Sequence, residues 1–285
     1  MEKIKKKIII SGATGFTGSV LSTLLSNHQY EIYAIKRDSN SRLAQNIPRL
    51  NEIDLDNEAQ VESILSTDNV AAVIHLATVY SRKEESSHKK QIWDANYLVG
   101  SKLLDLSISA KLHFVHIESY LQFEDLADTE YLKSKNAFSR LIDLERMRNR
   151  IGITSLIFFD NYGELDKRNK ILDQLIKAKL EGKSVLLEDG KRVIILTWIQ
   201  DVVMSIIESI NRKEFGRYRI NGSDKYFLSE LAAFVLHYPH ANQPFIVKEQ
   251  IYEAEKFPIL ESFRQTRNLF EYIQTSLSEN LKNNS

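Results

Sequence analysis

Two side chains that could carry out proton transfer stand four residues apart in the segment 130–148. A helix over this segment would place the ammonium of Lys135 one turn from the phenol of Tyr131. A neighbouring positive charge stabilises a phenolate and lowers the pKa of tyrosine from its ordinary value of about 10. The spacing therefore predicts a pair that transfers a proton near neutral pH.

The same tyrosine–lysine spacing occurs again at Tyr252–Lys256, as chance allows in a chain with 12 tyrosines. Context separates the two. Tyr131 follows the apolar run Leu112–Ile117, and Ser119 stands at the end of that run, where its hydroxyl could hydrogen-bond a substrate carbonyl. No such run precedes Tyr252. We predict the first pair and Ser119 as catalytic, the alternative for Ser119 being a polar strand end.

Three glycines directly follow the apolar run Lys7–Ser11 and precede the amphipathic stretch Ser19–His28. Gly12 would allow a tight turn off a strand, Gly15 would let the backbone approach a pyrophosphate, and Gly18 would let a helix pack closely. A surface turn of small residues is the alternative. The context favours a dinucleotide site whose loop contacts come from Gly12, Thr14, Gly15, Phe16, Thr17 and Gly18.

The second strand predicts which dinucleotide is bound. Lys36 and Arg37 occupy the place where an acidic residue would hold the ribose 2′-hydroxyl of NAD, so a 2′-phosphate and NADP(H) are favoured. Two alternatives stay open: Asp38 takes the acidic role through a one-residue shift, or the cations form a solvated strand end. Further predicted cofactor contacts are Asp54, Leu55, Leu76, Ala77 and Thr78, together with Tyr131 and Lys135.

Apolar, strand-like runs alternate with segments of helical length over the first half of the chain. The predicted strands are Lys7–Ser11, Glu31–Ile35, Ala71–His75, Leu112–Ile117 and Thr154–Phe159. The predicted helices are Gly18–Ser26, Glu58–Ser66, Ile92–Ile108 and Glu130–Arg148. This alternation implies a parallel sheet with helices on both faces, a doubly wound, Rossmann-type α/β fold.

The pattern changes after about Tyr162. The later predicted elements are a strand over Val193–Ile199, a helix over Asp201–Ile210, a strand over Arg217–Ile220, and helices near Ser229–Leu236 and Leu260–Tyr272. We predict an NADP(H)-binding domain over 1–162 and a smaller α+β substrate lobe over 163–285. The lobe would close over the carboxyl ends of the strands, where ligands of doubly wound folds bind.

Composition excludes several classes of function. The 285 residues are 43% hydrophobic and carry 38 basic and 38 acidic side chains, so a sizeable core is expected and a nucleic-acid or anionic-membrane footprint is not. The chain has no cysteine, which fits a cytoplasmic enzyme, and no apolar run approaches the roughly 18 residues that span a bilayer. His75, His113 and His116 lack a metal-ligand spacing, so no metal is expected.

These motifs occur in an order that resembles an extended short-chain dehydrogenase/reductase of the NAD-dependent epimerase/dehydratase family. The resemblance covers most of the chain and is strongest up to Gly163. It is carried by Gly12, Gly15 and Gly18, then Ile74–Thr78, Asn96, Ser119, Tyr131, Lys135 and Asn161–Gly163.

The resemblance implies a nucleotide-activated sugar as substrate, held by the C-terminal lobe. Asn96 stands where such enzymes place an asparagine of the proton relay, and Tyr80 and Asn161 are expected to contact the substrate. The short gap between Ser119 and Tyr131 is similar to that of CDP-paratose and CDP-abequose synthases, reductases that complete 3,6-dideoxyhexoses for bacterial O-antigens. A homodimer is one option for the assembly.

Departures from the family bear on the substrate. Two arginines usual in its nucleotide-sugar enzymes are replaced here by Ile194 and Ile157. A substrate pyrophosphate would instead need Arg192, Lys170 or Arg168 as its cation; the alternative is a substrate other than a nucleotide sugar.

The residues directly after Ser119 narrow the type of reaction. The resemblance would place an Asp-Glu pair there in a 4,6-dehydratase, and this chain has Tyr120 and Leu121. An exchangeable NADPH at Arg37 favours a reductase, in which Ser119 holds a ketone, Tyr131 gives the proton, and Lys135 with Asn96 restores it. The alternatives are an NAD-dependent nucleotide-sugar epimerase and, from another class, a non-catalytic NADP-sensing protein on the same fold.

Overall fold

The computed structural model describes residues 5–27, 30–36, 50–80, 86–126, 129–164, 166–187, 189–222 and 224–283. Its main element is a sheet of seven parallel strands in the order β3-β2-β1-β4-β5-β6-β9. The strands are β1 (Lys7–Ser11), β2 (Glu31–Ile35), β3 (Leu50–Ile53), β4 (Val70–His75), β5 (His113–Ser119), β6 (Ile153–Phe158) and β9 (Gly216–Ile220). The order confirms the predicted doubly wound fold.

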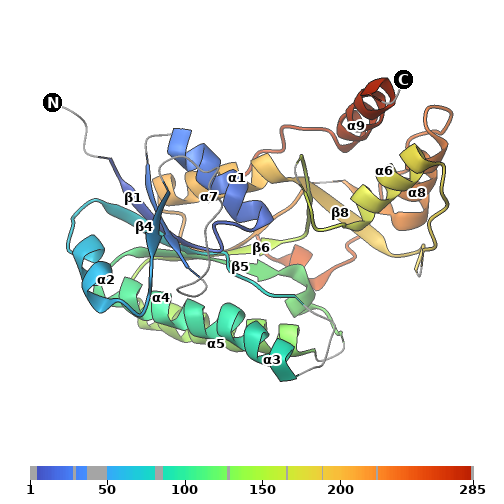
Figure 1. The fold of residues 1–285 in the computed structure, drawn as a ribbon. Helices are drawn as coiled ribbons and strands as arrows, with labels where there is room; N and C mark the ends of the chain where they lie inside the picture. The colour runs from blue at the N-terminus through green and yellow to red at the C-terminus, as the bar shows by residue number, and fades with distance from the viewer. Residues whose placement is uncertain are drawn as a thin grey trace.

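Helices cover both faces of this sheet (Figure 1). One face carries α1 (Phe16–Asn27) and α7 (Ile199–Arg212), whose apolar side chains share a core with Ile8 and Ile10 of β1. The other face carries α2 (Glu58–Leu65), α3 (Ser86–Trp93), α4 (Val99–Ser109) and α5 (Glu130–Arg148). Side chains on both faces of β1 are therefore buried, as its isoleucine run predicts.

Helix α5 has complete signals at both ends, which explains why the sequence predicts its bounds. The hydroxyl of Thr129 accepts from the backbone N–H of Leu132 at 3.3 Å, and Glu130 places a negative charge in the first turn. Asn149 ends the helix in the left-handed region, at a φ of 51°. Local capping residues therefore set both ends of the helix that carries Tyr131 and Lys135.

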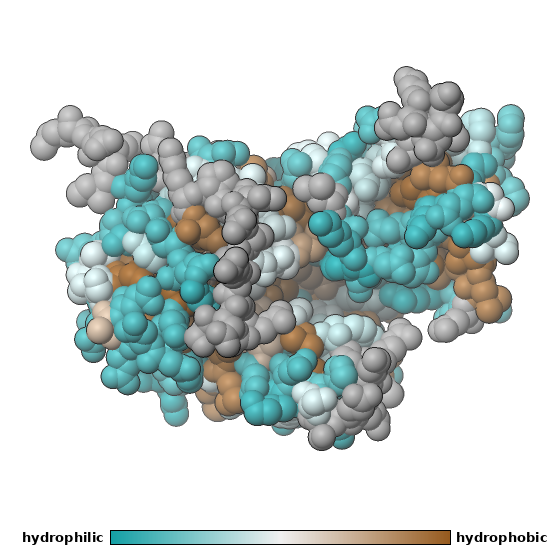
Figure 2. Space-filling model, in the orientation of Figure 1, coloured by the Kyte–Doolittle hydropathy of each residue, from teal (hydrophilic) through white to brown (hydrophobic). Residues whose placement is uncertain are grey.

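A smaller second lobe lies beyond the carboxyl ends of the central strands (Figure 1). Its sheet has the order β10-β8-β7, formed by β7 (Asp160–Tyr162), β8 (Val193–Trp198) and β10 (Lys225–Phe227). Helices α6 (Ile171–Glu181), α8 (Leu228–His237) and α9 (Leu269–Asn283) enclose its apolar core. Figure 2 shows the surface hollowed between the two parts.

Several elements differ from the sequence prediction. The strand at 217–220 and the helix at 201–210 belong to the large sheet layer, not to the smaller lobe, because β9 pairs with β6 and α7 packs on α1. The helix expected at 260–272 begins at Leu269, and a short strand not predicted from the sequence, β7, covers Asp160–Tyr162. The single helix expected over 92–108 is interrupted by a π-helical turn, Asp94–Leu98.

Within the described part of the chain, no helix is long and apolar enough to cross a membrane.

Candidate active site

The glycine loop joins β1 to α1, and backbone atoms lie close to two of its glycines. Gly12 has a φ of +79°, and a Cβ there would lie 2.6 Å from the backbone nitrogen of Ala77. A Cβ on Gly18 would lie 2.0 Å from the carbonyl oxygen of Gly12. Both positions therefore require glycine for the turn and for the close approach of α1.

Gly15 differs from these two because no atom of the described residues would crowd a side chain there. A Cβ there would meet the Gly12 carbonyl oxygen at 3.4 Å, an ordinary contact, and Gly15 is exposed together with Thr14. The first backbone N–H groups of α1 have no partner within a helix, and its first turn holds no acidic residue. This open turn fits the pyrophosphate of a dinucleotide.

The other predicted cofactor residues meet at the same edge of the sheet. After β4, the backbone N–H of Leu76 donates to the carbonyl of Ser11 at 3.0 Å, and Ala77 and Thr78 follow. After β3, Asp54 accepts from the N–H of Asp56 at 3.0 Å, which leads into Leu55 and α2. The carboxyl ends of β1, β3 and β4 thus converge around the glycine loop.

The cations predicted to choose the cofactor are only partly described. Lys36, at the end of β2, forms an ion pair with Glu52 of β3. Arg37 and Asp38 lie outside the described residues. A cofactor phosphate at Lys36 would share its ammonium with Glu52.

Ser119, Tyr131 and Lys135 come together where β5 ends against α5. Tyr131 is buried and hydrogen-bonds to the side chain of Ser119. Burial raises the pKa of Tyr131, and the bond to Ser119 opposes this rise. The spacing predicts a pKa lowered by Lys135. In this structure burial dominates instead, because the Lys135 ammonium donates to the carbonyl of Ile117 at 2.5 Å.

Lys135 is the second buried member of this pair. Burial lowers its pKa to about 8, while the carboxylate of Glu118 acts in the opposite direction. Lys135 is therefore an ammonium at neutral pH that loses its proton within reach of physiological conditions.

Asn96 lies in the π-helical turn 94–98, a type of turn that often occurs at functional sites. It is fully buried, and its Oδ1 accepts from the N–H of Val79 at 2.8 Å and from the hydroxyl of Thr78 at 3.1 Å. Its Nδ2 donates to Ser134 at 3.0 Å and to the Val79 carbonyl at 3.2 Å. The amide thus fixes the segment after β4 to α5, next to the predicted proton relay.

The second tyrosine–lysine motif forms no such pair. The hydroxyl of Tyr252 donates to the carbonyl of Val193 at 2.5 Å, and Lys256 forms an ion pair with Glu253. The segment 253–256 is a 3₁₀ turn, in which a four-residue spacing does not bring side chains together as an α-helix does.

Among the predicted substrate residues, Tyr80 contacts Tyr131. Tyr80 is 53% exposed, and its ring meets the edge of the Tyr131 ring at 5.1 Å between centroids. The ammonium of Lys170 lies 5.8 Å from the Tyr80 ring. Asn161 is buried on β7, and no described residue donates to its Oδ1.

Arg192 lies close to the end of β5. Its guanidinium donates to the hydroxyl of Tyr120 at 3.0 Å and to Asp160 at 3.2 Å, and its side chain is 45% exposed. Arg168 stacks on Phe16 of the glycine loop, with 4.2 Å from its guanidinium carbon to the ring centroid, and pairs with Asp166. Lys170 and Arg168 therefore lie beside predicted site residues, and Arg192 contacts Tyr120, which follows Ser119 in sequence.

An ion pair beside the site, formed by the buried Glu118 and the half-buried Arg217, was not identified from the sequence. Glu118 directly precedes Ser119, and it accepts a bidentate ion pair from Arg217 of β9. The signal available in the sequence was a charged residue, Glu118, directly after the apolar run 112–117. Its partner could not be identified, because Arg217 comes from a strand 99 residues away.

The strand histidines form hydrogen bonds within the sheet. His75 Nδ1 lies 2.7 Å from the hydroxyl of Ser11, and His116 Nε2 lies 2.6 Å from that of Ser155. Burial lowers the pKa of both imidazoles well below the ordinary value. Both rings are therefore neutral parts of the core beneath the site.

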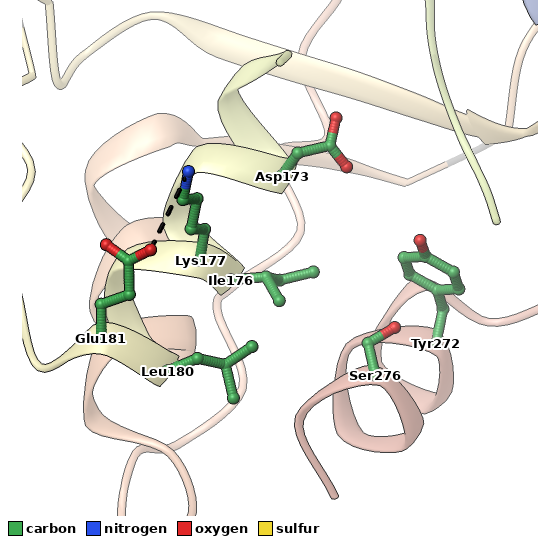
Figure 3. Close-up of a pocket in the computed structure, with 7 residues that line it drawn as sticks. All are labelled: Asp173, Ile176, Lys177, Leu180, Glu181, Tyr272 and Ser276. Atoms are coloured by element: carbon green, nitrogen blue, oxygen red, sulfur yellow. Dashed lines mark ion pairs between the residues drawn. The ribbon is translucent and has the colours of Figure 1, made fainter. Parts of the chain in front are cut away.

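A separate groove of about 420 Å³ lies in the smaller lobe between α6 and α9 (Figure 3). Its α6 wall includes Ile176, Leu180 and the ion pair between Lys177 and Glu181, and Tyr272 faces it from α9. None of the residues predicted to bind the cofactor or to transfer a proton lines this groove.

Known proteins resemble this chain in sequence. The sequence model of the NAD dependent epimerase/dehydratase family matches residues 8–220. The CDP-abequose synthase of Salmonella typhimurium is 28% identical over 227 residues, which are 76% of this chain and 75% of the relative. The CDP-abequose synthase of Yersinia pseudotuberculosis is 26% identical over 220 residues, which are 74% of this chain and 75% of the relative.

Solved structures share the fold at lower identity. The UDP-glucose 4-epimerase of Thermotoga maritima, solved with UDP-glucose, has a TM-score of 0.72 at 17% identity and covers 98% of this chain and 100% of its own. The dTDP-glucose 4,6-dehydratase of Bacillus anthracis, solved with NAD, has a TM-score of 0.74 at 17% identity, covering 98% of this chain and 97% of its own.

Proposed function

Because this chain belongs to the NAD dependent epimerase/dehydratase family, we propose that it is an NADPH-dependent reductase of the 4-keto group of a nucleotide-linked deoxyhexose. The sugar would carry CDP or dTDP, and the enzyme would work in the cytoplasm in bacterial surface polysaccharide biosynthesis. The likeness to CDP-abequose synthases supports this choice of substrate class.

One observation carries the proposal: the Ser119–Tyr131–Lys135 cluster stands at the same sheet edge as the glycine loop. Ser119 ends β5, and β5 pairs with β4, whose end packs against Gly12. A ligand held by the open turn at Gly15 would therefore extend toward Tyr131. The cofactor, when bound, would supply the hydride for the reduction.

The protein's own groups would handle the carbonyl oxygen and its proton. The hydroxyls of Ser119 and Tyr131, already hydrogen-bonded to each other, would both donate to the ketone oxygen of the substrate. Tyr131 would then transfer its proton to that oxygen as negative charge develops there. The nearby Lys135 ammonium would stabilise the resulting tyrosinate until a new proton arrives.

Cations at the edge of the site support a diphosphate substrate. Lys170 beside Tyr80 and Arg192 beside Tyr120 stand on the smaller lobe, where the nucleotide part of the substrate would lie. Charge-assisted hydrogen bonds to phosphate favour such placements. The choice of NADPH over NADH rests on Arg37 and Lys36 in the sequence.

A turnover experiment tests the proposal. The protein is incubated with NADPH and a 4-keto deoxyhexose linked to CDP or dTDP, and loss of NADPH absorbance is compared with product formation by NMR. We expect one NADPH consumed per sugar reduced. Interconversion of sugars without net NADPH loss would identify an epimerase, and binding without turnover would identify a sensor; either result overturns the proposal.

A thermal-shift panel of NAD, NADP, CDP, dTDP, UDP and GDP would identify the ligands. A ligand that binds only the folded state at a hundredfold excess over Kd stabilises it by about 2.7 kcal/mol.

A further inference from the structure

Glu118 is a carboxylate inside the sheet, 1% exposed, directly before the proposed catalytic Ser119. A buried charge is unfavourable unless it is paired and hydrogen-bonded. Arg217 supplies both, with its Nε 2.7 Å from one carboxylate oxygen and its terminal nitrogen 3.0 Å from the other. Glu118 is therefore paired at both carboxylate oxygens, although the proposed reaction makes no direct use of it.

Successive turns of α5 form hydrogen bonds to the end of β5, one of them to this carboxylate. Lys135 donates to the carbonyl of Ile117 at 2.5 Å, and Ser139, one turn later, donates to Glu118 at 2.7 Å. Tyr131, one turn before Lys135, bonds to the residue that follows Glu118. Residues spaced by four lie along one side of a helix, so this side of α5 is fixed against β5.

A second path reaches the backbone of Ser119. Its N–H donates to the side-chain oxygen of Gln122 at 2.8 Å, and the amide nitrogen of Gln122 donates to Ser139 at 2.9 Å. The hydroxyl of Ser139 thus joins Gln122 to Glu118, and the chain of bonds ends at Arg217 of β9. Each hydroxyl and amide in it has one defined role as donor and acceptor.

We propose that Glu118 is the positioning residue of this site, which fixes α5 against the end of β5 and supplies the negative charge that keeps Lys135 an ammonium. Its contribution to turnover rests on the proposed function, but its action on Lys135 does not. The positive charge of Arg217 offsets part of the effect that the Glu118 carboxylate has on Lys135.

The groups that face Lys135 from the surrounding elements are consistent with this role. His75 of β4 and His116 and Glu118 of β5 interact electrostatically with Lys135, and Tyr131 lies one turn before it on α5. Both histidines are kept neutral by burial, and Tyr131 is a neutral phenol whose pKa burial raises. The carboxylate of Glu118 is thus the charge in this group that opposes the loss of the Lys135 proton.

Paired substitutions test the proposal through the pH dependence of kcat/KM for reduction. Glu118→Gln keeps the shape and removes the charge, so the loss of activity at high pH should begin about one pH unit lower. Arg217→Gln leaves the carboxylate unbalanced, so the same loss should begin at higher pH. A purely structural role would lower the rate in both variants without opposite displacements; that outcome, or an unmoved profile, overturns the proposal.

Asp143→Asn provides the matched control. Asp143 also bonds to Arg217, at 2.9 Å, but it makes no hydrogen bond or ion pair with β5 among the described contacts. Its removal should displace the profile less than Glu118→Gln does. An equal displacement would show that the site senses the net charge of the cluster, and not Glu118, which also overturns the proposal.

A readout without substrate separates this inference from the proposed function. The ¹³Cε signal of Lys135, assigned with Lys135→Arg, is titrated in the ligand-free protein. Glu118→Gln should lower the Lys135 pKa below its value of about 8, and Arg217→Gln should raise it. If the pKa moves and no ketosugar is reduced, the proposed function fails and the inference stands. If the Lys135 pKa is the same in all variants, the inference fails. Should either Glu118→Gln or Arg217→Gln not fold, the remaining variant alone is compared with the unmodified protein.

Discussion

Gly15→Ala should weaken cofactor binding while leaving the fold intact. A Cβ at this position meets the Gly12 carbonyl oxygen at 3.4 Å, which is ordinary van der Waals contact. Alanine in place of glycine just before a helix costs up to about 1 kcal/mol, or roughly 2–4 °C in Tm for a chain of this size. The new methyl group would occupy the surface expected to contact the pyrophosphate, and a loss of about 1.4 kcal/mol there raises Kd about tenfold.

Gly18→Ala is the matched control from the same loop. Its Cβ would lie 2.0 Å from the carbonyl oxygen of Gly12 and 2.8 Å from Cα of Ala13. Both contacts are with backbone atoms, so α1 itself must move. Overpacking of this kind costs about 1–3 kcal/mol, and the shift displaces the phosphate-binding turn. We therefore expect Tm and cofactor affinity to fall together.

Two measurements on each variant are needed: Kd for NADPH by fluorescence titration and Tm by calorimetry. We expect the two variants to differ: Gly15→Ala should change Kd far more than Tm, whereas Gly18→Ala should change both. If Gly15→Ala binds NADPH as the unmodified protein does, the pyrophosphate does not lie on this turn. Equal losses of Tm in the two variants would show that Gly15 is also required by packing.

Three further outcomes are expected from the site. Tyr131→Phe should lower turnover roughly 10²-fold or more with NADPH still bound, since it removes only the proton donor. Tyr252→Phe should lose about 1 kcal/mol of stability, because its hydrogen bond to Val193 is lost, and should keep its turnover. Similar kinetics in the two variants would contradict the choice of motif. Arg37→Asp should reverse or erase a preference for NADPH over NADH in titrations, and equal affinities in the unmodified protein would count against a 2′-phosphate site. Arg192→Ala should raise KM for a nucleotide-linked ketosugar about tenfold while leaving Kd for NADPH unchanged. The reason is that a charge-assisted hydrogen bond contributes about 1.5 kcal/mol or more. An unaltered KM would show that Arg192 does not bind the substrate.

The elements that the sequence predicts correctly are those with local signals. The bounds of β1, β2 and α5 match the predicted Lys7–Ser11, Glu31–Ile35 and Glu130–Arg148. Apolar runs that end at glycine or at a charge, and a helix with a threonine before it and an asparagine after it, depend only on neighbours in sequence. The convergence of Ser119, Tyr131 and Lys135 is equally local, since β5 and α5 are consecutive.

Long-range pairing explains the features that were missed. The strand 216–220 returns to the large sheet beside β6, and nothing in its five residues indicates that edge rather than the smaller lobe. The π-helical turn at Asn96 arises where one helix must meet both the segment after β4 and Ser134 of α5. Such choices are made by tertiary contacts, to which local periodicity is insensitive.

Ile157 and Ile194 stand where the resemblance implies arginines, and the structure places both in apolar surroundings. Ile157 is fully buried in β6 and Ile194 is 2% exposed in β8, each within an apolar cluster where an unpaired guanidinium would be unfavourable. Arg192 directly precedes β8, and its guanidinium donates to Tyr120, which belongs to the same apolar cluster as Ile157. There it is partly exposed and touches Tyr120, next to Ser119. Arg192 thus places a partly exposed cation next to the end of β5, and this is why the Arg192→Ala measurement of KM decides how a diphosphate substrate would be held.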